Sequence, residues 1–212
     1  MRSDIKNIIF DYGNVIFDIN FSKTQAAFEA LGIEQVANFF SHSGQHPLFD
    51  NFDRGLISKA DFFNGIRLAA KNYALTDSDI QDAWNSLLLG VNAPNHEVLK
   101  EVKNHYRSFL LSNNNEIHYE WILKHLKEAH GLEGLADFFE KIYLSHEVGI
   151  RKPDEAIFAL ILRENGLVAA ETLFIDDSPQ HLETARHLGI QTLLMDKPPA
   201  ALRTLLIEAE IL

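Results

Sequence analysis

The sequence contains no cysteine, and this absence excludes disulfides, zinc–thiolate sites and cysteine nucleophiles among its 212 residues. No apolar run approaches the roughly 20 residues that a bilayer-spanning helix requires. Internal repeats and low-complexity linkers are also missing. The opening segment MRSDIKNIIF contains an acid, Asp4, and only a short apolar run. We therefore interpret it as leading into a first strand and not as a secretory signal.

The chain also lacks a surplus of positive charge, because 19 Lys and Arg face 30 Asp and Glu, for a net charge of -11. Nucleic-acid binding requires clustered Lys and Arg, so this balance argues against it. A small phosphorylated substrate remains possible, since a metal ion can supply local positive charge. We expect a soluble, cytoplasmic monomer or homodimer, with neither a nucleic acid nor a membrane as partner.

Short apolar runs that suit buried strands alternate with helical patterns from about residue 95 onward. These runs are YRSFLLS, KIYLS, TLFID and IQTLLM, and IIF near the start adds one more. Helices are predicted over about 116–130, before the stop signal Gly166, and after Ser178 as N-cap with Pro179 in the first turn. The alternation predicts an α/β protein with a doubly wound parallel sheet, formed by residues 1–16 and 92–212.

Residues 17–91 show no strand pattern. Ser22 with Gln25 and Ser58 with Asp61 resemble helix starts, the first as a capping box. A further helix ending at Gly90 is predicted by four apolar residues at helical spacing: Ile80, Trp84, Leu87 and Leu88. We therefore predict a helical insert between the first strand and the rest of the sheet.

Polar residues follow the predicted strands at the edge where doubly wound sheets bind ligands. They are Asp11, Ser112, Asn113, Lys152, Asp176 and Asp177. Each alone could be a turn carboxylate, a helix cap, a solvated lysine or a helix-entry acid. Together they favour a shared site, because all of them fall at the same edge of the sheet.

Three carboxylates brought together repel one another, and a hard divalent cation such as Mg²⁺ relieves that repulsion through oxygen ligands. Lys152 adds a point charge, while Ser112 and Asn113 add hydrogen-bond donors. Such a set can hold a phosphoryl group and balance its charge. A carboxylate in the same place can act as a nucleophile, giving an aspartyl-phosphate intermediate.

Four segments of the chain resemble the signature motifs of the haloacid dehalogenase superfamily. In order they are IIFDYGNV, FLLSNN, VGIRKPDEAIF and LFIDDSPQHLETARHLGI. The resemblance covers the predicted sheet nearly end to end and implies a Rossmann-like core with residues 17–91 as a helical cap. The stretches DYGNVIFDIN, LSNNNEIH and DRGLIS are most similar to the bacterial sugar-phosphate phosphatases of this superfamily, including those acting on glucose 1-phosphate.

The resemblance implies a Mg²⁺-dependent phosphatase that acts on a small phosphorylated metabolite, with Asp11 attacking phosphorus. It implies that the metal is held by the Asp11 carboxylate, the Gly13 carbonyl and Asp177, with Asp176 bound directly or through water. The implied phosphate-binding groups are Ser112, Asn113, Lys152 and the backbone amides of Tyr12 and Gly13. Arg54, in DRGLIS, is a candidate for reaching the substrate, although it could equally be a solvated loop residue.

Two other functions deserve comparison. Carbon–halogen hydrolysis also uses an aspartate nucleophile, but it needs no metal, and the dehalogenase branch has serine and asparagine where Asp176 and Asp177 stand. The other alternative is a binding or regulatory protein with little turnover. It is motivated by Gly13, since active phosphatases of the superfamily usually have a second aspartate there as general acid and base. That catalytic help is worth about 100- to 10,000-fold.

Two routes could compensate for Gly13. His118, His146 and His181 lie near predicted strand ends, and histidine titrates near neutrality, although each is more readily explained as structural or surface. Alternatively, an anomeric phosphate as substrate needs little acid, because its leaving oxygen is less basic than an ordinary alkoxide. We hypothesise that Gly13 favours sugar 1-phosphates or similarly activated esters.

Overall fold

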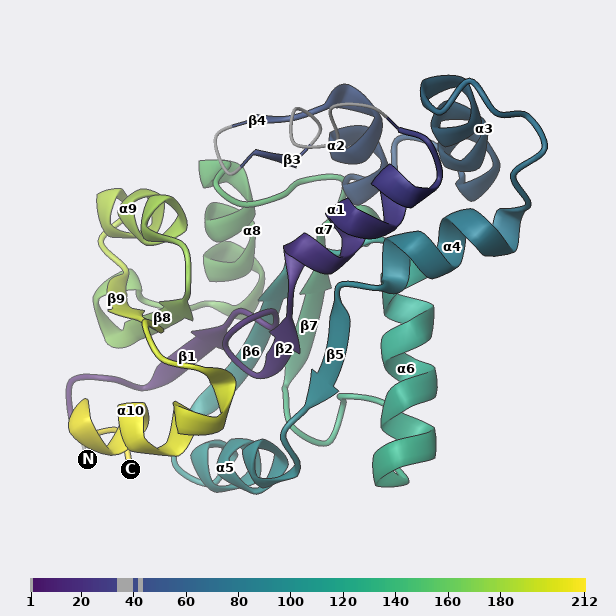
Figure 1. The fold of residues 1–212 in the computed structure, drawn as a ribbon. Coiled ribbons are helices and arrows are strands. Elements are labelled where there is room, and N and C mark those ends of the chain that lie inside the picture. Colours follow the sequence, from purple (N-terminus) through teal and green to yellow (C-terminus); the bar gives the residue numbers. More distant parts are fainter. Residues whose placement is uncertain (1, 34–39, 42–43) are drawn as a thin grey trace.

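A computed structural model describes residues 2–33, 40–41 and 44–212 (Figure 1). Its main sheet has five parallel strands in the order β7-β6-β1-β8-β9. The strands are β1 (Asn7–Phe10), β6 (Arg107–Ser112), β7 (Lys141–Leu144), β8 (Thr172–Asp176) and β9 (Gln191–Leu194). This confirms the predicted doubly wound sheet, and each strand falls within about two residues of its apolar run.

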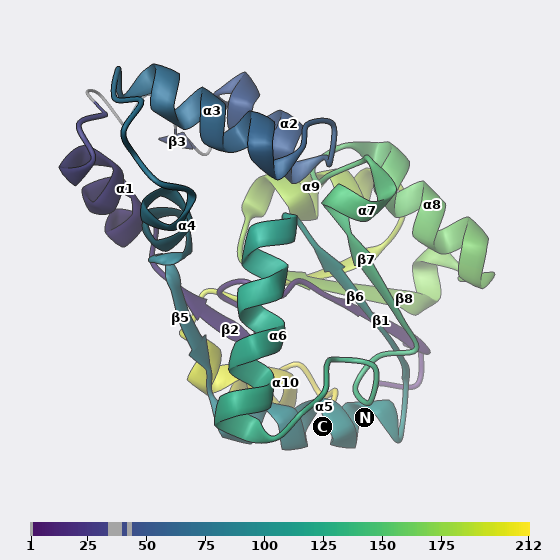
Figure 2. The ribbon, with the colours of Figure 1, turned by 90° about the vertical axis from the view of Figure 1, so that its right-hand side faces the viewer.

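The sheet is covered on both faces, which explains why its strands are apolar throughout. Ile8 and Phe10 of β1 face α5 (Ala93–Lys103), α6 (Glu116–His130) and α10 (Leu202–Glu208). Ile9 points to the other face, against α8 (Glu155–Asn165) and α9 (Pro179–His187). Figure 2 shows α6 on one side of β6 and β7, with α8 and α9 on the other. All three β1 side chains are fully buried.

The predicted helix signals in this part of the chain are confirmed. Helix α6 begins after Asn115, whose side chain accepts a hydrogen bond from the His118 amide, and ends at Gly131 in the left-handed conformation. Gly166 ends α8 in the same way. Ser178 is the N-cap residue of α9, with Pro179 in its first turn. Three short helices complete this part: α7 (Ser145–Val148), η2 (Ala169–Glu171) and η3 (Pro199–Ala201).

The helices of residues 17–91, a segment that we call the insert, lie above the carboxyl ends of β6 and β7 in Figure 1. Its helices are α1 (Phe21–Ala30), α2 (Pro47–Asp53), α3 (Lys59–Ala69) and α4 (Asp77–Asn85). Their shared core is strongly aromatic, with Phe28, Phe49, Phe52, Phe62 and Trp84 buried together. The chain enters and leaves the insert through an antiparallel pair, β2 (Phe17–Ile19) and β5 (Leu88–Val91). The division of the chain at residues 17 and 91 stays a prediction.

Two details of the predicted insert are wrong. The insert does contain strands, since β2 pairs with β5 and β3 (Phe40–Ser41) pairs with β4 (Gly44–Gln45). The helix expected to reach Gly90 ends at Asn85, because Leu88–Val91 pairs with β2 and Gly90 adopts a φ of 125° that a helix does not allow. Apolar residues at mixed spacing fit both patterns, and the long-range pairing decides between them.

The helix starts of the insert are partly as predicted. Ser58 and Asp61 form a reciprocal capping box at the start of α3. Ser22 does not cap α1, because Asn20 occupies that position and its side chain accepts a hydrogen bond from the Ser22 amide. Strand β2 ends at Ile19, so the helix can begin directly after Asn20.

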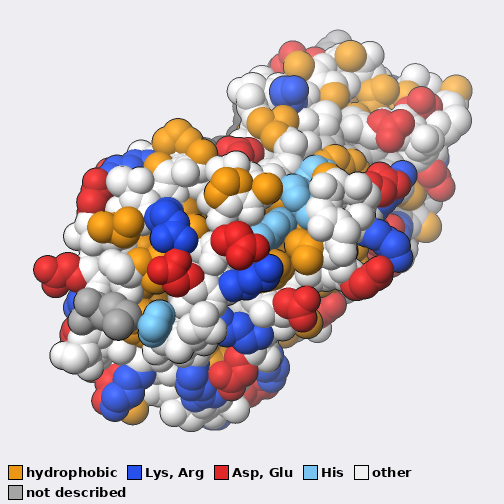
Figure 3. All heavy atoms as spheres, turned by 90° about the horizontal axis from the view of Figure 1, so that it is seen from below, with side chains coloured by type: hydrophobic (Ala, Val, Ile, Leu, Met, Phe, Trp, Pro, Cys, Tyr) orange, Lys and Arg blue, Asp and Glu red, His pale blue; other side chains and the backbone are white. Residues whose placement is uncertain are grey.

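The face opposite the insert mixes acidic and basic side chains and shows no large area of one sign (Figure 3). In the described part of the chain, no helix combines the length and the apolar character needed to cross a membrane. The polar residues that were predicted to form a site lie at the opposite end of the sheet, at its carboxyl edge.

Candidate active site

The candidate site lies where the strand order reverses, between β1 and β8, the position at which doubly wound sheets bind ligands. Phe10 pairs with Leu110 of β6 and with Ile175 of β8. The residues one step further along, Asp11 and Asp176, therefore lie side by side at the carboxyl edge. The Asp11 amide donates to the Ile175 carbonyl at 2.9 Å, which continues the strand pairing as far as the carboxylate.

Lys152 reaches this edge from the loop after α7 and is 1% exposed. Its ammonium group donates to Asp11 Oδ1 at 2.6 Å, to Asp176 Oδ2 at 2.7 Å and to the Leu111 carbonyl at 3.0 Å. Burial alone would lower the pKa of Lys152, but the charges of Asp11 and Asp176 raise it above the ordinary value. The lysine therefore stays charged and neutralises part of the carboxylate group.

The acids in the site experience different surroundings. Burial raises the pKa of Asp11 to about 7, and Asp176 and Asp177 add to this while Lys152 opposes it. Burial also raises the pKa of Asp177, more than its hydrogen bond from Asn14 lowers it. For Asp176, burial is outweighed by Lys152 and His181, which hold its pKa below the usual value. Negative charge here is thus incompletely balanced by the protein.

Oxygen atoms of Asp11, Asp176 and Asp177 lie within 4.8 Å of one another. Over the residues that the structure describes, this is the only group of three or more acidic or histidine side chains close enough to hold one metal ion. Buried, mutually repelling carboxylates are the donor set that a hard cation such as Mg²⁺ prefers. The residues present therefore fit a divalent cation.

The two oxygens of Asp176 are already engaged by the protein. Its Oδ1 accepts from the Ser178 amide at 2.8 Å and lies 2.9 Å from His181 Nδ1, while Oδ2 accepts from Lys152. Asp11 uses only Oδ1 for Lys152. The lone pairs of Asp11 and Asp177 are therefore more available to a metal than those of Asp176.

Ser112 and Asn113 lie at the end of β6 beside this group, but their side chains are placed differently. Ser112 is the last strand residue and is buried. The Asn113 side chain donates to the Lys152 carbonyl and accepts from the Lys152 amide, both at 2.9 Å. Its amide group therefore holds the backbone of the lysine loop in register with β6.

Tyr12 and Gly13 begin the loop that follows Asp11. The Tyr12 ring is buried in the core beside Phe17, at a centroid distance of 5.2 Å, so only its backbone can face the site. A Cβ atom on Gly13 would come within 2.9 Å of Ile19 Cδ1. A residue larger than glycine would therefore require the end of the Ile19 side chain to shift.

Arg54 ends α2 in the insert, and its Nε donates to Asp50 Oδ2 at 2.9 Å. Arg151, next to Lys152, donates to Asp50 Oδ1, also at 2.9 Å. Asp50 therefore joins an arginine of the insert to an arginine of the sheet domain. The Asn115 side chain donates through Nδ2 to Asp53 Oδ1 at 2.9 Å and adds a second link between the same two parts.

Of the candidate histidines, only His181 contacts the carboxylate group. His118 is buried, stacks on Trp84 at 4.5 Å, and has Nε2 3.0 Å from the Trp84 carbonyl. His146 Nδ1 lies 3.1 Å from the Asn114 carbonyl. These contacts place His118 in the packing between α4 and α6, and His146 beside the loop that follows β6.

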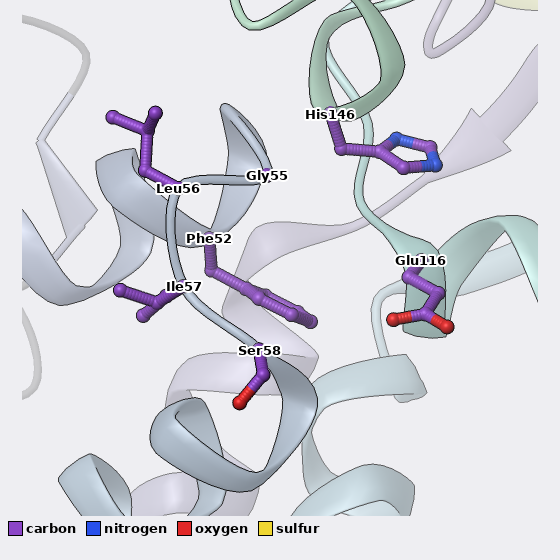
Figure 4. A pocket seen from close by; sticks show the side chains of 7 residues that line it. All are labelled: Phe52, Gly55, Leu56, Ile57, Ser58, Glu116 and His146. Atoms are coloured by element: carbon purple, nitrogen blue, oxygen red, sulfur yellow. The ribbon is translucent and has the colours of Figure 1, made fainter.

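A cavity of about 370 Å³ opens between the insert and the sheet domain (Figure 4). The turn between α2 and α3 lines one side, while His146 and Glu116 line the other. Gly55 in that turn has a φ of 65°, and a Cβ atom there would come within 2.1 Å of the His146 carbonyl. The insert thus approaches the sheet domain closely at one wall of this cavity.

Sequence reasoning missed Asn14, whose side chain contacts Asp177, one of the three clustered carboxylates. Its Nδ2 donates to Asp177 Oδ2 at 3.0 Å, and its backbone has a φ of 54°. A signal was available, because asparagine directly after glycine is a residue type that tolerates the left-handed conformation. The Asp50–Arg151 link gave no such signal, since 101 residues separate its partners.

The sheet, the insert and the clustered carboxylates together define a hydrolase of a known type. The chain belongs to the haloacid dehalogenase-like hydrolase family, whose model matches residues 5–189. This confirms the resemblance seen in four separate segments of the sequence.

Several members of this family are similar to the chain over nearly its whole length. The chain is 29% identical to D-ribitol-5-phosphate phosphatase of Bacteroides thetaiotaomicron, over 89% of this chain and 90% of the relative. A solved structure of a family enzyme from the same organism, in complex with magnesium and inorganic phosphate, is 33% identical with a TM-score of 0.79, covering 90% of this chain and 93% of that one. A predicted family hydrolase from Porphyromonas gingivalis is 30% identical with a TM-score of 0.81, covering 96% and 98%.

Proposed function

We propose that this protein is a magnesium-dependent phosphatase that hydrolyses a small sugar or polyol phosphate through a phosphoaspartate on Asp11. The observation that carries the proposal is the buried Asp11 at the end of β1, held by Lys152 at 2.6 Å within a group of three carboxylates. The likeness to D-ribitol-5-phosphate phosphatase supports a polyhydroxylated substrate.

The proposed reaction has two steps. A carboxylate oxygen of Asp11 attacks phosphorus, and the bond between phosphorus and the sugar oxygen breaks with its electron pair on that oxygen, which then takes a proton. Water next attacks phosphorus in the phosphoaspartate, and the bond between phosphorus and the Asp11 oxygen breaks. The proton lost by the water leaves with inorganic phosphate or goes to solvent, and the Asp11 carboxylate is restored. Lys152 binds Oδ1 of Asp11 and leaves Oδ2 available either to attack phosphorus or to bind the metal.

Asp11, Asp177 and the Gly13 carbonyl would hold Mg²⁺ directly. Because the protein already engages the two oxygens of Asp176, we assign that residue a contact through water. Bound there, the cation would neutralise the site and polarise the phosphoryl oxygens. A cation also favours the charged forms of Asp11 and Asp177, whose pKa values burial otherwise raises.

Lys152, Ser112 and the backbone amides of Tyr12 and Gly13 would bind the phosphoryl group. Asn113 would contribute by holding the Lys152 backbone, since its side chain is committed to that loop. The insert would act as the helical cap that selects the substrate, with Arg54 and Arg151 both held by Asp50.

The test is a set of phosphate esters assayed with Mg²⁺, with a chelator, and with Asp11→Asn. The set includes D-ribitol 5-phosphate, glucose 1-phosphate and glucose 6-phosphate, and the exposed Asp137→Asn serves as a matched control. We expect activity that disappears with the chelator and in Asp11→Asn but survives in the control. Activity that survived both treatments would overturn the mechanism, and inactivity towards the whole set would favour a binding protein.

The same assay tests the hypothesis about Gly13. If the missing acid restricts the enzyme to good leaving groups, glucose 1-phosphate should react faster than glucose 6-phosphate, because its leaving oxygen is less basic. Faster turnover of the 6-phosphate would show that another group supplies the proton.

A further inference from the structure

The loop between β1 and β2 is tightly folded around Asn14. The amides of Ile16 and Phe17 both donate to the Tyr12 carbonyl at 2.9 Å, and the Asn14 amide donates to the Phe17 carbonyl at 2.7 Å. Asn14 takes the left-handed conformation, with a φ of 54°. Glycine and asparagine are both found in this conformation, so the backbone alone does not explain why the chain has asparagine here.

The Asn14 side chain bridges two parts of the site. Its Nδ2 donates to Asp177 Oδ2 at 3.0 Å, and its Oδ1 accepts from the Ile19 amide at 3.4 Å. The reverse orientation would set its oxygen against the carboxylate and its NH₂ group against an N–H donor, so the partners fix the orientation. One side chain therefore connects the carboxylate that follows β8 with strand β2, where the chain enters the insert.

The orientation of the Asp177 side chain depends on its hydrogen bond from Asn14, whereas Asp11 and Asp176 have another partner. Asp11 and Asp176 are both held by Lys152. Within the described residues, Asn14 is the one side chain that hydrogen-bonds to Asp177. The bond favours the charged form of Asp177 and restricts its rotation, so that its lone pairs stay directed towards the other carboxylates.

We propose that Asn14 is a positioning residue for the metal: it holds Asp177 in the ligating orientation and ties that ligand to the entrance of the insert. The proposal rests on the magnesium site described under the proposed function. Residues that orient metal ligands typically contribute 10- to 100-fold to metal affinity. We therefore expect loss of the Asn14 amide to weaken Mg²⁺ binding about 10-fold or more.

The experiment measures Mg²⁺ binding by isothermal titration calorimetry in the absence of substrate, for the full chain, Asn14→Gly and Asn14→Ala. Both variants remove the amide, but only Asn14→Gly also relieves the left-handed backbone. Lys71→Gly is the matched control, because exposed Lys71 has a φ of 50° on the insert. The melting temperature of each metal-free protein reports the structural effect separately.

We expect both Asn14 variants to show a similarly raised Kd for Mg²⁺, while Asn14→Ala has a lower melting temperature without metal than Asn14→Gly. Lys71→Gly should bind Mg²⁺ like the unchanged protein. Unchanged affinity in both Asn14 variants would overturn the positioning role while leaving the magnesium site intact. Affinity retained in Asn14→Gly but lost in Asn14→Ala would assign the effect to the backbone and would also overturn it. Failure of the unchanged protein to bind Mg²⁺ would overturn the proposed function itself.

Discussion

Replacing Lys152 by methionine should destabilise the metal-free protein strongly, although the two side chains have similar length. Lys152 is almost completely buried and is the cation that both Asp11 and Asp176 contact, at 2.6 and 2.7 Å. Removing one partner of a buried ionic group leaves uncompensated charge, which typically costs about 3–5 kcal/mol. We therefore expect a loss of that size in the free energy of unfolding, measured by urea denaturation with a chelator present.

The same variant should recover part of this loss when Mg²⁺ is added, because a cation bound among the carboxylates replaces some of the missing charge. The matched control is Lys127→Met, which removes an exposed ion pair with Glu133. Such surface pairs contribute about 0–1 kcal/mol, so the control should unfold close to the unchanged protein. If Lys152→Met were no less stable than Lys127→Met, our description of a charge-balancing lysine would be refuted.

Three further outcomes follow from the contacts of His118, Gly13 and Asp50. Burial lowers the pKa of His118 to about 4, so the unfolded chain binds a proton more readily than the folded protein does. The free energy of unfolding is therefore highest above about pH 6.5 and falls as the pH is lowered towards 4. About 2 kcal/mol should disappear between pH 7 and pH 5, and urea denaturation of His118→Gln should show a smaller loss over that range. Gly13→Asp combined with Ile19→Ala, which clears the contact at Cδ1, should raise turnover of glucose 6-phosphate more than that of glucose 1-phosphate; equal gains would argue that leaving-group protonation is not limiting. Asp50→Asn should raise KM with little change in melting temperature, because Asp50 links Arg54 to Arg151 in partly exposed pairs, and an unchanged KM would separate this link from substrate binding.

The sheet and the positions of its strand-end residues could be predicted from the sequence because their signals are local. Each strand is a short apolar run, and Asp11, Ser112 and Asp176 follow or end such runs directly. The parallel arrangement then brings residues from distant segments to one edge without further information. The helix termini at Asn115, Gly131 and Gly166 are also set by nearby residues.

The remaining features depend on contacts between distant residues, which a sequence pattern does not specify. Leu88–Val91 is a strand because β2 lies beside it, and its own spacing suits a helix equally well. Asn113 could be expected near a phosphate, but in the folded protein its side-chain amide lies against the Lys152 backbone and forms hydrogen bonds with it. The space beside Gly13 is filled by Ile19, and only the folded loop reveals that contact.

The first turn of α6 contributes to the core of the insert, although it belongs by sequence to the sheet domain. Ile117 is buried among the insert's aromatic side chains, and the Trp84 indole donates to Asn115 at 3.2 Å. A chimera that exchanges residues 17–91 for those of a relative would therefore leave a mismatched surface under the new helices. A chimera that acquires the substrate preference of the relative should require residues 115–118 to be transferred together with the insert. Substitutions in this turn and in the insert are therefore expected to occur together when specificity changes during evolution.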